Sequence, residues 1–326
     1  MKAKTLPTLT LTACLFLLNV DSQAQVPLSN NILQMSNVTI NDSLQSNPMQ
    51  SAYEVSGYMV KERLLSEDKE NIKIIDDISE NDLIVVNGTY DHMHLVLSSL
   101  RLPFIRISQH QLKDVKLEPH QTVFVNCATN FPEDQARKLA TFVAQGGQLI
   151  TSDWALKNVL EVGFPGYVSF NEKLTADEVV RVEVMDKDDP VINGFLDEKT
   201  APVWWLEGSS YPIKVLNKDK VKVLIRSNEL KDKYGEEAVL IKFNHGKGVV
   251  YHMISHFYLQ RTETKDAKQK TNANAYMLDK NISISEDSAL KGQIENLDYG
   301  TVQSANTSSE FIMRAVVNQK KKNSKE

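Results

Sequence analysis

One cysteine and two histidines further along the chain have side chains that could form a nucleophilic site. Cys127 follows an apolar run, and His252 and His256 lie at the end of another. A thiol becomes a good nucleophile only when a nearby base or positive field favours the thiolate. A cysteine at a strand end is otherwise a small, buried apolar side chain. Both interpretations stay open, and the candidate catalytic residues are Cys127, His252 and His256.

A second group of polar and aromatic residues stands at or near the ends of apolar runs. Ligands of open parallel sheets bind beyond the carboxyl ends of the strands, which would gather this group at one edge. Asp153 would alternatively cap the helix after it. Trp204 and Trp205 are adjacent on one strand and face opposite sides, so one could enter the core while the other lines a cleft or contacts a partner. The equally weighted alternative is that the long loop covers both. The candidate ligand-binding residues are Asn87, Asn126, Ser152, Asp153, Trp154 and Trp205.

Asp91, His92 and His94, together with His252 and His256, include side chains of the kinds that bind zinc. His92 and His94 are two positions apart at the start of a predicted helix, so their rings would not share a face. The preferred interpretation is that Asp91 caps this helix and that the histidines are solvated. No metal or cofactor is therefore expected.

Strands that alternate with helices must position these residues. A helix is predicted at 92–100. Another opens at Pro132, where the missing N–H costs little, and ends at Gly146. Continuous apolar strands between helices favour a parallel sheet covered on both faces. The predicted fold class is α/β, a flavodoxin-like three-layer sandwich with a mostly parallel central sheet. Its first four strands are predicted at 83–86, 104–107, 122–125 and 148–151.

The second half is richer in strands and belongs to the same single domain, predicted at 81–319. Residues 262–300 are polar with little periodicity, which predicts a loop insertion. A capping box at 307–310 opens a C-terminal helix at 307–319, and a basic tail follows at 320–326. The additional strands are predicted at 179–184, 203–206, 213–216, 221–225, 238–243 and 249–253.

The N-terminus is typical of a signal peptide at 1–24. Two lysines precede an apolar stretch, and small residues precede a cleavage point after Ala24. Cys14 loosely fits a lipoprotein box, but the apolar run continues past it, so anchoring is the less favoured alternative. Residues 25–80 are predicted to be a flexible leader that includes a short helix near 52–65. The mature chain is expected to be exported, either periplasmic or secreted.

Composition narrows the classes of function. The 326 residues are 41% hydrophobic and 24% charged, which are values of a globular protein. A net charge of -5 argues against a nucleic-acid surface. No later apolar run is long enough to span a membrane. If Cys14 leaves with the signal peptide, Cys127 is the one remaining cysteine and no intrachain disulfide forms.

Three stretches together resemble the class I glutamine amidotransferase-like superfamily, in particular its ThuA-like and uncharacterised branches. They are the strand, helix and Gly-Gly run at 124–151, Asp-Pro-Val-Ile-Asn-Gly-Phe at 189–195, and His-Gly-Lys-Gly-Val-Val-Tyr-His at 245–252. Active members of this superfamily place a cysteine within Gly-x-Cys-x-Gly at a sharp turn from strand to helix. Here the turn reads Ser-Asp-Trp-Ala at 152–155, without cysteine or glycine. The resemblance therefore implies the fold but not the reaction.

Three hypotheses of function follow, and the balance leans against an enzyme. The first is a non-catalytic module on this scaffold that binds a small ligand, a glycan or a protein. The second is a cysteine-dependent hydrolase or amidase that uses Cys127 with His252 or His256. The third is a metal-dependent sugar-processing enzyme, which the ThuA-like resemblance implies.

Overall fold

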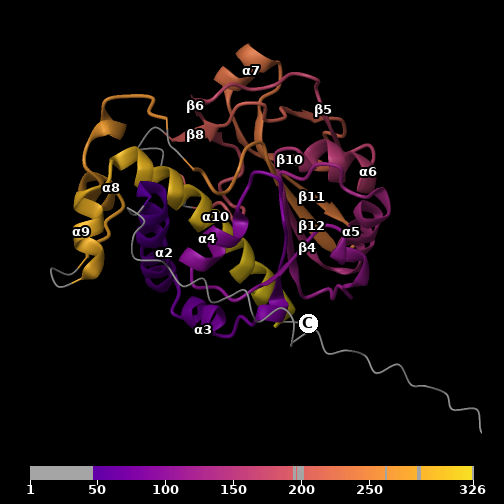
Figure 1. The fold of residues 1–326 in the computed structure, drawn as a ribbon, viewed down its shortest axis with the longest axis horizontal. Coiled ribbons are helices and arrows are strands. Elements are labelled where there is room, and N and C mark those ends of the chain that lie inside the picture. The colour runs from indigo at the N-terminus through magenta and orange to yellow at the C-terminus, as the bar shows by residue number, and fades with distance from the viewer. Residues whose placement is uncertain (1–46, 194–195, 197–201, 261–262, 285–287, 325–326) are drawn as a thin grey trace, which may run out of the picture. The chain divides into compact units, whose positions relative to one another are not determined.

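A computed structural model describes residues 47–193, 196, 202–260, 263–284 and 288–324, all within one compact unit (Figure 1). The predicted signal peptide, the Cys14 alternative and the leader up to residue 46 lie outside the described residues. None of the described helices combines the length and apolar character needed to cross a bilayer.

Among the described residues, the central sheet has ten strands, and the side that begins at the edge strand β2 is parallel. Parallel strands follow the spatial order β2, β1, β3, β4 and β12, and antiparallel strands β11, β10 and β7 extend the sheet from β12. Strand β9 pairs with β11 and β5 with β9. This arrangement confirms the predicted α/β fold with additional strands in the second half. The bounds are Leu83–Val86 (β1), Ile105–Ile107 (β2), Thr122–Asn126 (β3), Gln148–Ser152 (β4), Val168–Phe170 (β5), Glu183–Val184 (β7), Ile213–Val215 (β9), Val221–Arg226 (β10), Ala238–His245 (β11) and Gly248–Met253 (β12).

Helices cover both faces of this sheet, and a separate two-stranded sheet pairs β6 (Glu178–Arg181) with β8 (Val203–Leu206). In Figure 1, α5 and α6 lie on one side of the sheet, and α2, α4 and α10 lie on the other. The bounds are Pro48–Glu67 (α2), Glu70–Asp76 (α3), Met93–Ser99 (α4), Glu133–Gln145 (α5), Glu161–Gly163 (α6), Asn228–Tyr234 (α7), Ala273–Asp279 (α8), Ala289–Glu295 (α9) and Tyr299–Asn323 (α10). Shorter turns are the 3₁₀ segments Glu80–Asp82, Gln111–Asp114 and Lys268–Lys270 and the π-helical segment Leu156–Leu160.

The core explains why the first strands are apolar throughout. Strands β1, β3 and β4 are buried along their whole length because helices cover them on both sides. On one face, the backbone carbonyl of Ala315 in α10 accepts a hydrogen bond from Nε2 of Gln148 at 3.1 Å. On the same helix, Phe311 packs edge-on against Tyr251 of β12, with ring centroids 5.7 Å apart.

The predicted flexible leader is wrong for residues 47–80. Helix α2 is 20 residues long, and residues such as Tyr53 and Val55 are fully buried. It packs against α10, so the segment belongs to the domain (Figure 1). Serine and glycine residues on α2 interrupted the apolar pattern and concealed its length, because small residues let helices pack closely while adding no hydrophobic signal.

The predicted loop at 262–300 contains helices α8 and α9 and the first residues of α10. The predicted helix at 307–319 begins eight residues earlier, at Tyr299, and continues into the predicted basic tail. Thr307 is not a cap, because it is buried inside α10 and its hydroxyl donates to the carbonyl of Gln303 at 2.9 Å. Helix α10 is buried around nearly its whole circumference although it is largely polar, so it shows none of the one-sided periodicity of a surface helix.

Candidate functional site

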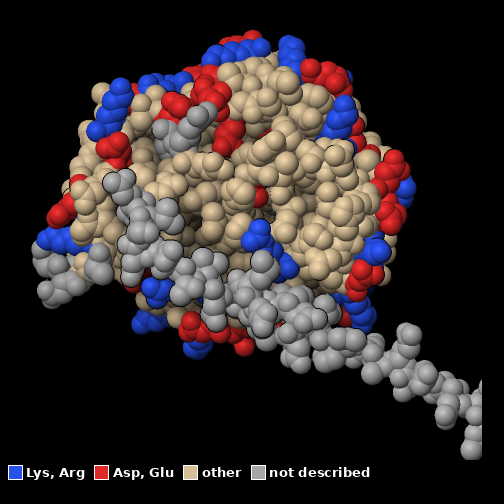
Figure 2. All heavy atoms as spheres, viewed as in Figure 1, with Lys and Arg blue, Asp and Glu red and all other residues tan. Residues whose placement is uncertain are grey.

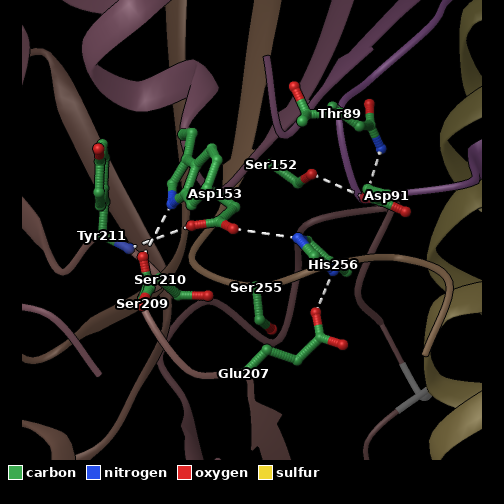
Figure 3. Close-up of polar contacts among 12 residues, drawn as sticks. Thr89, Asp91, Ser152, Asp153, Glu207, Ser209, Ser210, Tyr211, Ser255 and His256 are labelled. Atoms are coloured by element: carbon green, nitrogen blue, oxygen red, sulfur yellow. Dashed lines mark hydrogen bonds and ion pairs between the residues drawn. The ribbon is translucent and has the colours of Figure 1, made fainter. Parts of the chain in front are cut away.

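Four parallel strands bring their carboxyl ends together at one edge of the sheet. Strands β1, β3, β4 and β12 are neighbours with matching registers. The residues that follow these ends include Asp91, Cys127, Asp153 and His256, and Figure 3 shows three of them converging. This is the edge at which the sequence predicted a site.

Two of these residues have an unusual backbone. Cys127 has φ 45° and Asp153 has φ 51°, a region that non-glycine residues seldom adopt. The Cys127 N–H donates to the carbonyl of Ser152 at 3.0 Å, and the Asp153 N–H donates to Met253 at 2.9 Å. Each turn is therefore held by hydrogen bonds to the adjacent strand, and such strain is concentrated at functional positions.

Asp91 is a buried carboxylate with a complete set of donors. Its two oxygens accept hydrogen bonds from the Asn126 amide, the Ser152 hydroxyl and the backbone N–H groups of Phe257 and Tyr258, at 2.8–3.0 Å. These donors belong to three separate segments of the chain. Asp91 therefore joins the loops after β1, β3, β4 and β12, and it does not cap a helix through its side chain as predicted.

Beside Asp91 lies a cluster of a thiol, an imidazole and two carboxylates. Nε2 of His256 is 3.1 Å from Oδ2 of Asp153, and its Nδ1 contacts Oε2 of Glu207 (Figure 3). The other oxygen of Asp153 accepts from the backbone N–H of Tyr211 at 3.2 Å. The Cys127 sulfur lies within 4.8 Å of both the Asp153 and the His256 donor atoms. The structure thus brings together Cys127 and His256, two candidates for nucleophilic chemistry.

Burial and neighbouring charge shift the protonation of this cluster. Burial raises the pKa of the Cys127 thiol above its ordinary value, although His256 partly opposes the effect. Burial likewise raises the pKa of Asp153. Burial alone would lower the pKa of His256, but contacts with Asp153, Cys127 and Glu207 hold that pKa well above its ordinary value. The thiol is therefore poorly ionised, whereas the imidazole is readily protonated.

The other histidine candidates do not join the cluster. His252 lies inside β12, where its Nδ1 is 2.9 Å from the hydroxyl of Thr151, and burial lowers its pKa to about 3. The rings of His92 and His94 lie edge to face, with centroids 5.8 Å apart. Burial and the Arg106 guanidinium lower the pKa of His94 to about 4.

The aromatic candidates occupy different environments. Trp154 is half-buried beside the 56%-exposed ring of Tyr90, and its Nε1 donates to the carbonyl of Ser209 at 2.8 Å. Trp205 is only 5% exposed and Trp204 only 4%, so both rings are buried, which agrees with the alternative that both are covered and not with a ring that lines a cleft. The Nε1 of Trp205 donates to the carbonyl of Glu263, at 3.0 Å, in the segment predicted to be a loop.

The remaining candidates mostly serve structural contacts. The Asn126 and Ser152 side chains bond to Asp91, as described above, and the Asn87 side chain accepts from Nε of Arg106. Glu207 was missed by the sequence reasoning. It follows β8 directly, as polar site residues follow strands elsewhere in the chain, but β8 lies outside the main sheet and so did not predict a place in the cluster.

Comparisons with known proteins do not identify a family for this chain. No protein-family model and no curated protein matches the chain. A cytoplasmic protein from Salmonella typhimurium aligns with 54% of this chain and 87% of its own, at 12% identity and a TM-score of 0.37. An exo-β-1,4-mannosidase from Opitutaceae bacterium strain TAV5 aligns with 54% of this chain at 12% identity and a TM-score of 0.36. A β-galactosidase from Bacillus circulans sp. alkalophilus aligns with 59% at 16% identity and a TM-score of 0.36.

The aligned part spans 31% of the mannosidase and 32% of the β-galactosidase. Similarities this low identify no family, so a functional assignment depends on the chemistry of the site itself.

Proposed function

We propose that the chain is a non-catalytic module that binds a small ligand, a glycan or a protein segment at the carboxyl edge of its parallel sheet. The observation that carries the proposal is the side chain at the sharp turn after β4. It is the carboxylate of Asp153, which is already bound to His256 and to the backbone of Tyr211. No attacking atom occupies this turn, where an amidotransferase would place its cysteine.

The aromatic residues beside this turn offer a surface for a ligand. The ring of Trp154 lies edge-on to Tyr90, with centroids 5.4 Å apart, and is 6.0 Å from the ring of Tyr211. Flat, partly exposed rings next to strand-end polar groups suit a ligand that has one apolar face and one polar edge. Figure 2 shows one side of the molecule, where charged side chains lie mainly near the outline and uncharged residues cover the middle.

The alternative is the cysteine-dependent hydrolase, and one observation favours it: Cys127 and His256 are in contact. An imidazole held by a carboxylate on its far nitrogen is the arrangement that activates thiols in such enzymes. However, Cys127 is fully buried and its raised pKa disfavours the thiolate. A substrate carbonyl would need to reach a sulfur that solvent does not reach.

Labelling of Cys127 separates the two functions. In a full-length C14S variant treated with a chelator, we expect iodoacetamide to react with Cys127 at neutral pH roughly 100-fold or more slowly than in guanidinium chloride, because a buried thiol reacts only after local opening. Labelling of the native protein as fast as the denatured chain, with loss of that rate in H256Q, would establish an activated nucleophile and contradict the proposal.

The binding surface is tested in the same preparation. A panel of sugars, amino acids and short peptides is screened by the thermal shift of the protein, and at least one class should raise the melting temperature through Trp154. The shift should disappear in W154A and persist in L278A, which removes an exposed apolar side chain elsewhere on the molecule. Shifts that are equal in W154A and the unsubstituted protein would place binding elsewhere.

The proposal includes export, periplasmic or secreted. N-terminal sequencing of the chain recovered from cells should then find Gln25 as the first residue.

A further inference from the structure

We propose that Cys127, Asp153 and His256 bind one transition-metal ion of the zinc class. The inference rests on the proposed function in one respect, since it names a ligand for the same cluster of strand-end residues. Within the described part of the chain, these three form the one group of cysteine, histidine and acidic side chains whose donor atoms all lie within 4.8 Å of one another.

The donor types and their spacing fit such an ion. A thiolate, a carboxylate and an imidazole all bind zinc, with bonds of about 2.0–2.3 Å, so donors in a tetrahedron lie about 3.3–3.8 Å apart. Nε2 of His256 is 3.1 Å from Oδ2 of Asp153, and the sulfur of Cys127 is within 4.8 Å of one donor atom of each of these residues. Side-chain movements of roughly an ångström or less would complete these bonds.

Each donor is also held in orientation by a second group. Glu207 contacts Nδ1 of His256, which leaves Nε2 facing Asp153. Zinc-bound histidines commonly donate their other N–H to a carboxylate in this way. The free oxygen of Asp153 accepts the Tyr211 N–H, and the sulfur of Cys127 accepts a backbone hydrogen bond from Tyr90. Hydrogen bonds of this kind around the ligands hold the donor atoms of a metal site in place.

The cluster has bonding capacity that its own members do not use. Nε2 of His256 is buried and makes no hydrogen bond of good geometry, although it lies beside the Asp153 carboxylate. Of the described cationic groups, only His256 pairs with Asp153 and with Glu207. Two carboxylates and a thiol therefore surround one imidazole, which can balance only one of the two carboxylate charges. A further cation would balance the other.

An ion pair alone accounts for only part of this arrangement. It would explain Asp153 and His256, but it requires neither the sulfur of Cys127 nor the left-handed backbone that directs that sulfur toward them. Three protein donors would leave one tetrahedral position open, which water or a donor atom of the bound ligand would fill.

Cobalt(II) is the probe that tests the site, because its absorption reports both tetrahedral geometry and a bond to thiolate. The full-length C14S variant is stripped with a chelator, dialysed and titrated with cobalt chloride. We expect one equivalent to produce strong visible bands and a thiolate-to-cobalt charge-transfer band in the near ultraviolet. Zinc should then displace the cobalt, because zinc generally binds such sites more tightly.

Substitutions identify the ligands. In the C14S background, C127S should lose the charge-transfer band, and D153N and H256Q should lose stoichiometric binding at micromolar protein. E207Q should keep the band but weaken affinity about 10- to 100-fold, as expected for a group that acts through the ligand. H94Q, at a histidine outside the cluster, is the matched control and should titrate like the unsubstituted chain.

Failure of cobalt to bind the folded chain at one equivalent would overturn the proposal, as would bound cobalt without a thiolate band. The band is measured in a chain with an intact cluster, so this result does not depend on whether a variant folds. Loss of the metal proposal would leave Trp154-dependent ligand binding standing. Rapid labelling of metal-free Cys127 would instead contradict the non-catalytic function and leave the cobalt result unchanged.

Discussion

Asp91 and Asp153 have the same exposure, 3%, and both follow parallel strands at the same edge of the sheet. Asp91 accepts four hydrogen bonds, two of them from backbone N–H groups. Asp153 accepts one backbone hydrogen bond and faces the imidazole of His256 (Figure 3). The thiol of Cys127 lies near the same carboxylate. One carboxylate is thus satisfied by the fold, whereas the other is surrounded by groups that bind metals or react.

This difference separates structural from functional burial. A buried anion with a full set of donors stabilises the loops that supply them. A buried anion with few donors is costly, and here burial raises the pKa of Asp153. Such a group is retained at a site only when something else requires it. The contrast leads us to propose Asp153, rather than Asp91, as the functional carboxylate at this edge.

The largest effect should come from D91N. An amide oxygen in the position of Oδ2 still accepts from Asn126, Ser152 and Phe257, but the NH₂ group then faces the Tyr258 N–H, so one buried hydrogen bond is lost and the other three lose their charged acceptor. A hydrogen bond to a charged group is worth about 1.5–3 kcal/mol and one between neutral groups about 1 kcal/mol, which predicts a loss of about 3 kcal/mol or more in the free energy of unfolding by urea. D68N is the control, because Asp68 accepts a backbone N–H at an exposed site. If D91N and D68N were equally stable, Asp91 would not have the structural role that its hydrogen bonds indicate.

An effect of intermediate size on stability is expected at acid pH, where the histidines His252 and His256 can be compared in the same way as the two carboxylates. The pKa of His252 is lowered by burial to about 3, whereas the pKa of His256 is raised. In the unfolded chain His252 takes up a proton near pH 6.5, whereas in the folded chain it stays neutral at that pH because its pKa is about 3. Stability from this residue is therefore complete above that pH and falls by about 1.4 kcal/mol per pH unit below it.

Urea unfolding between pH 6.5 and 5 measures this slope. H252N should flatten the decline by about one proton relative to the unsubstituted chain. His94, whose pKa is lowered to about 4, contributes in the same direction in both proteins, so the difference between them isolates His252. Identical slopes would show that His252 titrates normally in the folded state.

The smallest effect should come from D153N. Removing this poorly satisfied charge from the metal-free protein relieves a desolvation cost and loses a contact with His256, but Glu207 still pairs with that imidazole, so no buried charge is left alone. The free energy of unfolding is therefore expected to fall by less than the roughly 3–5 kcal/mol that an uncompensated buried charge costs, and by less than in D91N. A loss as large as that of D91N would mean that both carboxylates are structural and would remove the contrast between them.

Local patterns predicted the parallel part of the fold. Strand β1 lies at the predicted 83–86, and Gly146, with φ 129°, ends α5 as expected. Such elements can be predicted from the sequence because a strand buried on both faces is continuously apolar and a helix end favours glycine. Helix α10 was found only in part, because its buried residues include serine, asparagine and glutamate. Asn306 and Glu310, for example, bond to Tyr276 and Arg63 of other helices.

The sequence predicted that several of these residues gather at one edge of the sheet, but it did not predict which of them contact one another. The strand-end rule selected Asp153, Cys127 and His256 among others. It could not choose between His252 and His256, since only the backbone path after Met253 decides which imidazole meets the thiol. Glu207 lies 49 positions before His256 in the sequence and follows a strand of a separate small sheet. A contact between residues so far apart in the sequence leaves no local pattern.

The most direct test of the account is anomalous X-ray diffraction, at the zinc absorption edge, from crystals of the full-length C14S protein equilibrated with zinc. The account predicts one strong peak bonded to Sγ of Cys127, Oδ2 of Asp153 and Nε2 of His256, with Asp91 still holding its four donors. A cluster without a peak, or a zinc ion bound elsewhere while Asp153 and His256 keep their ion pair, would contradict it.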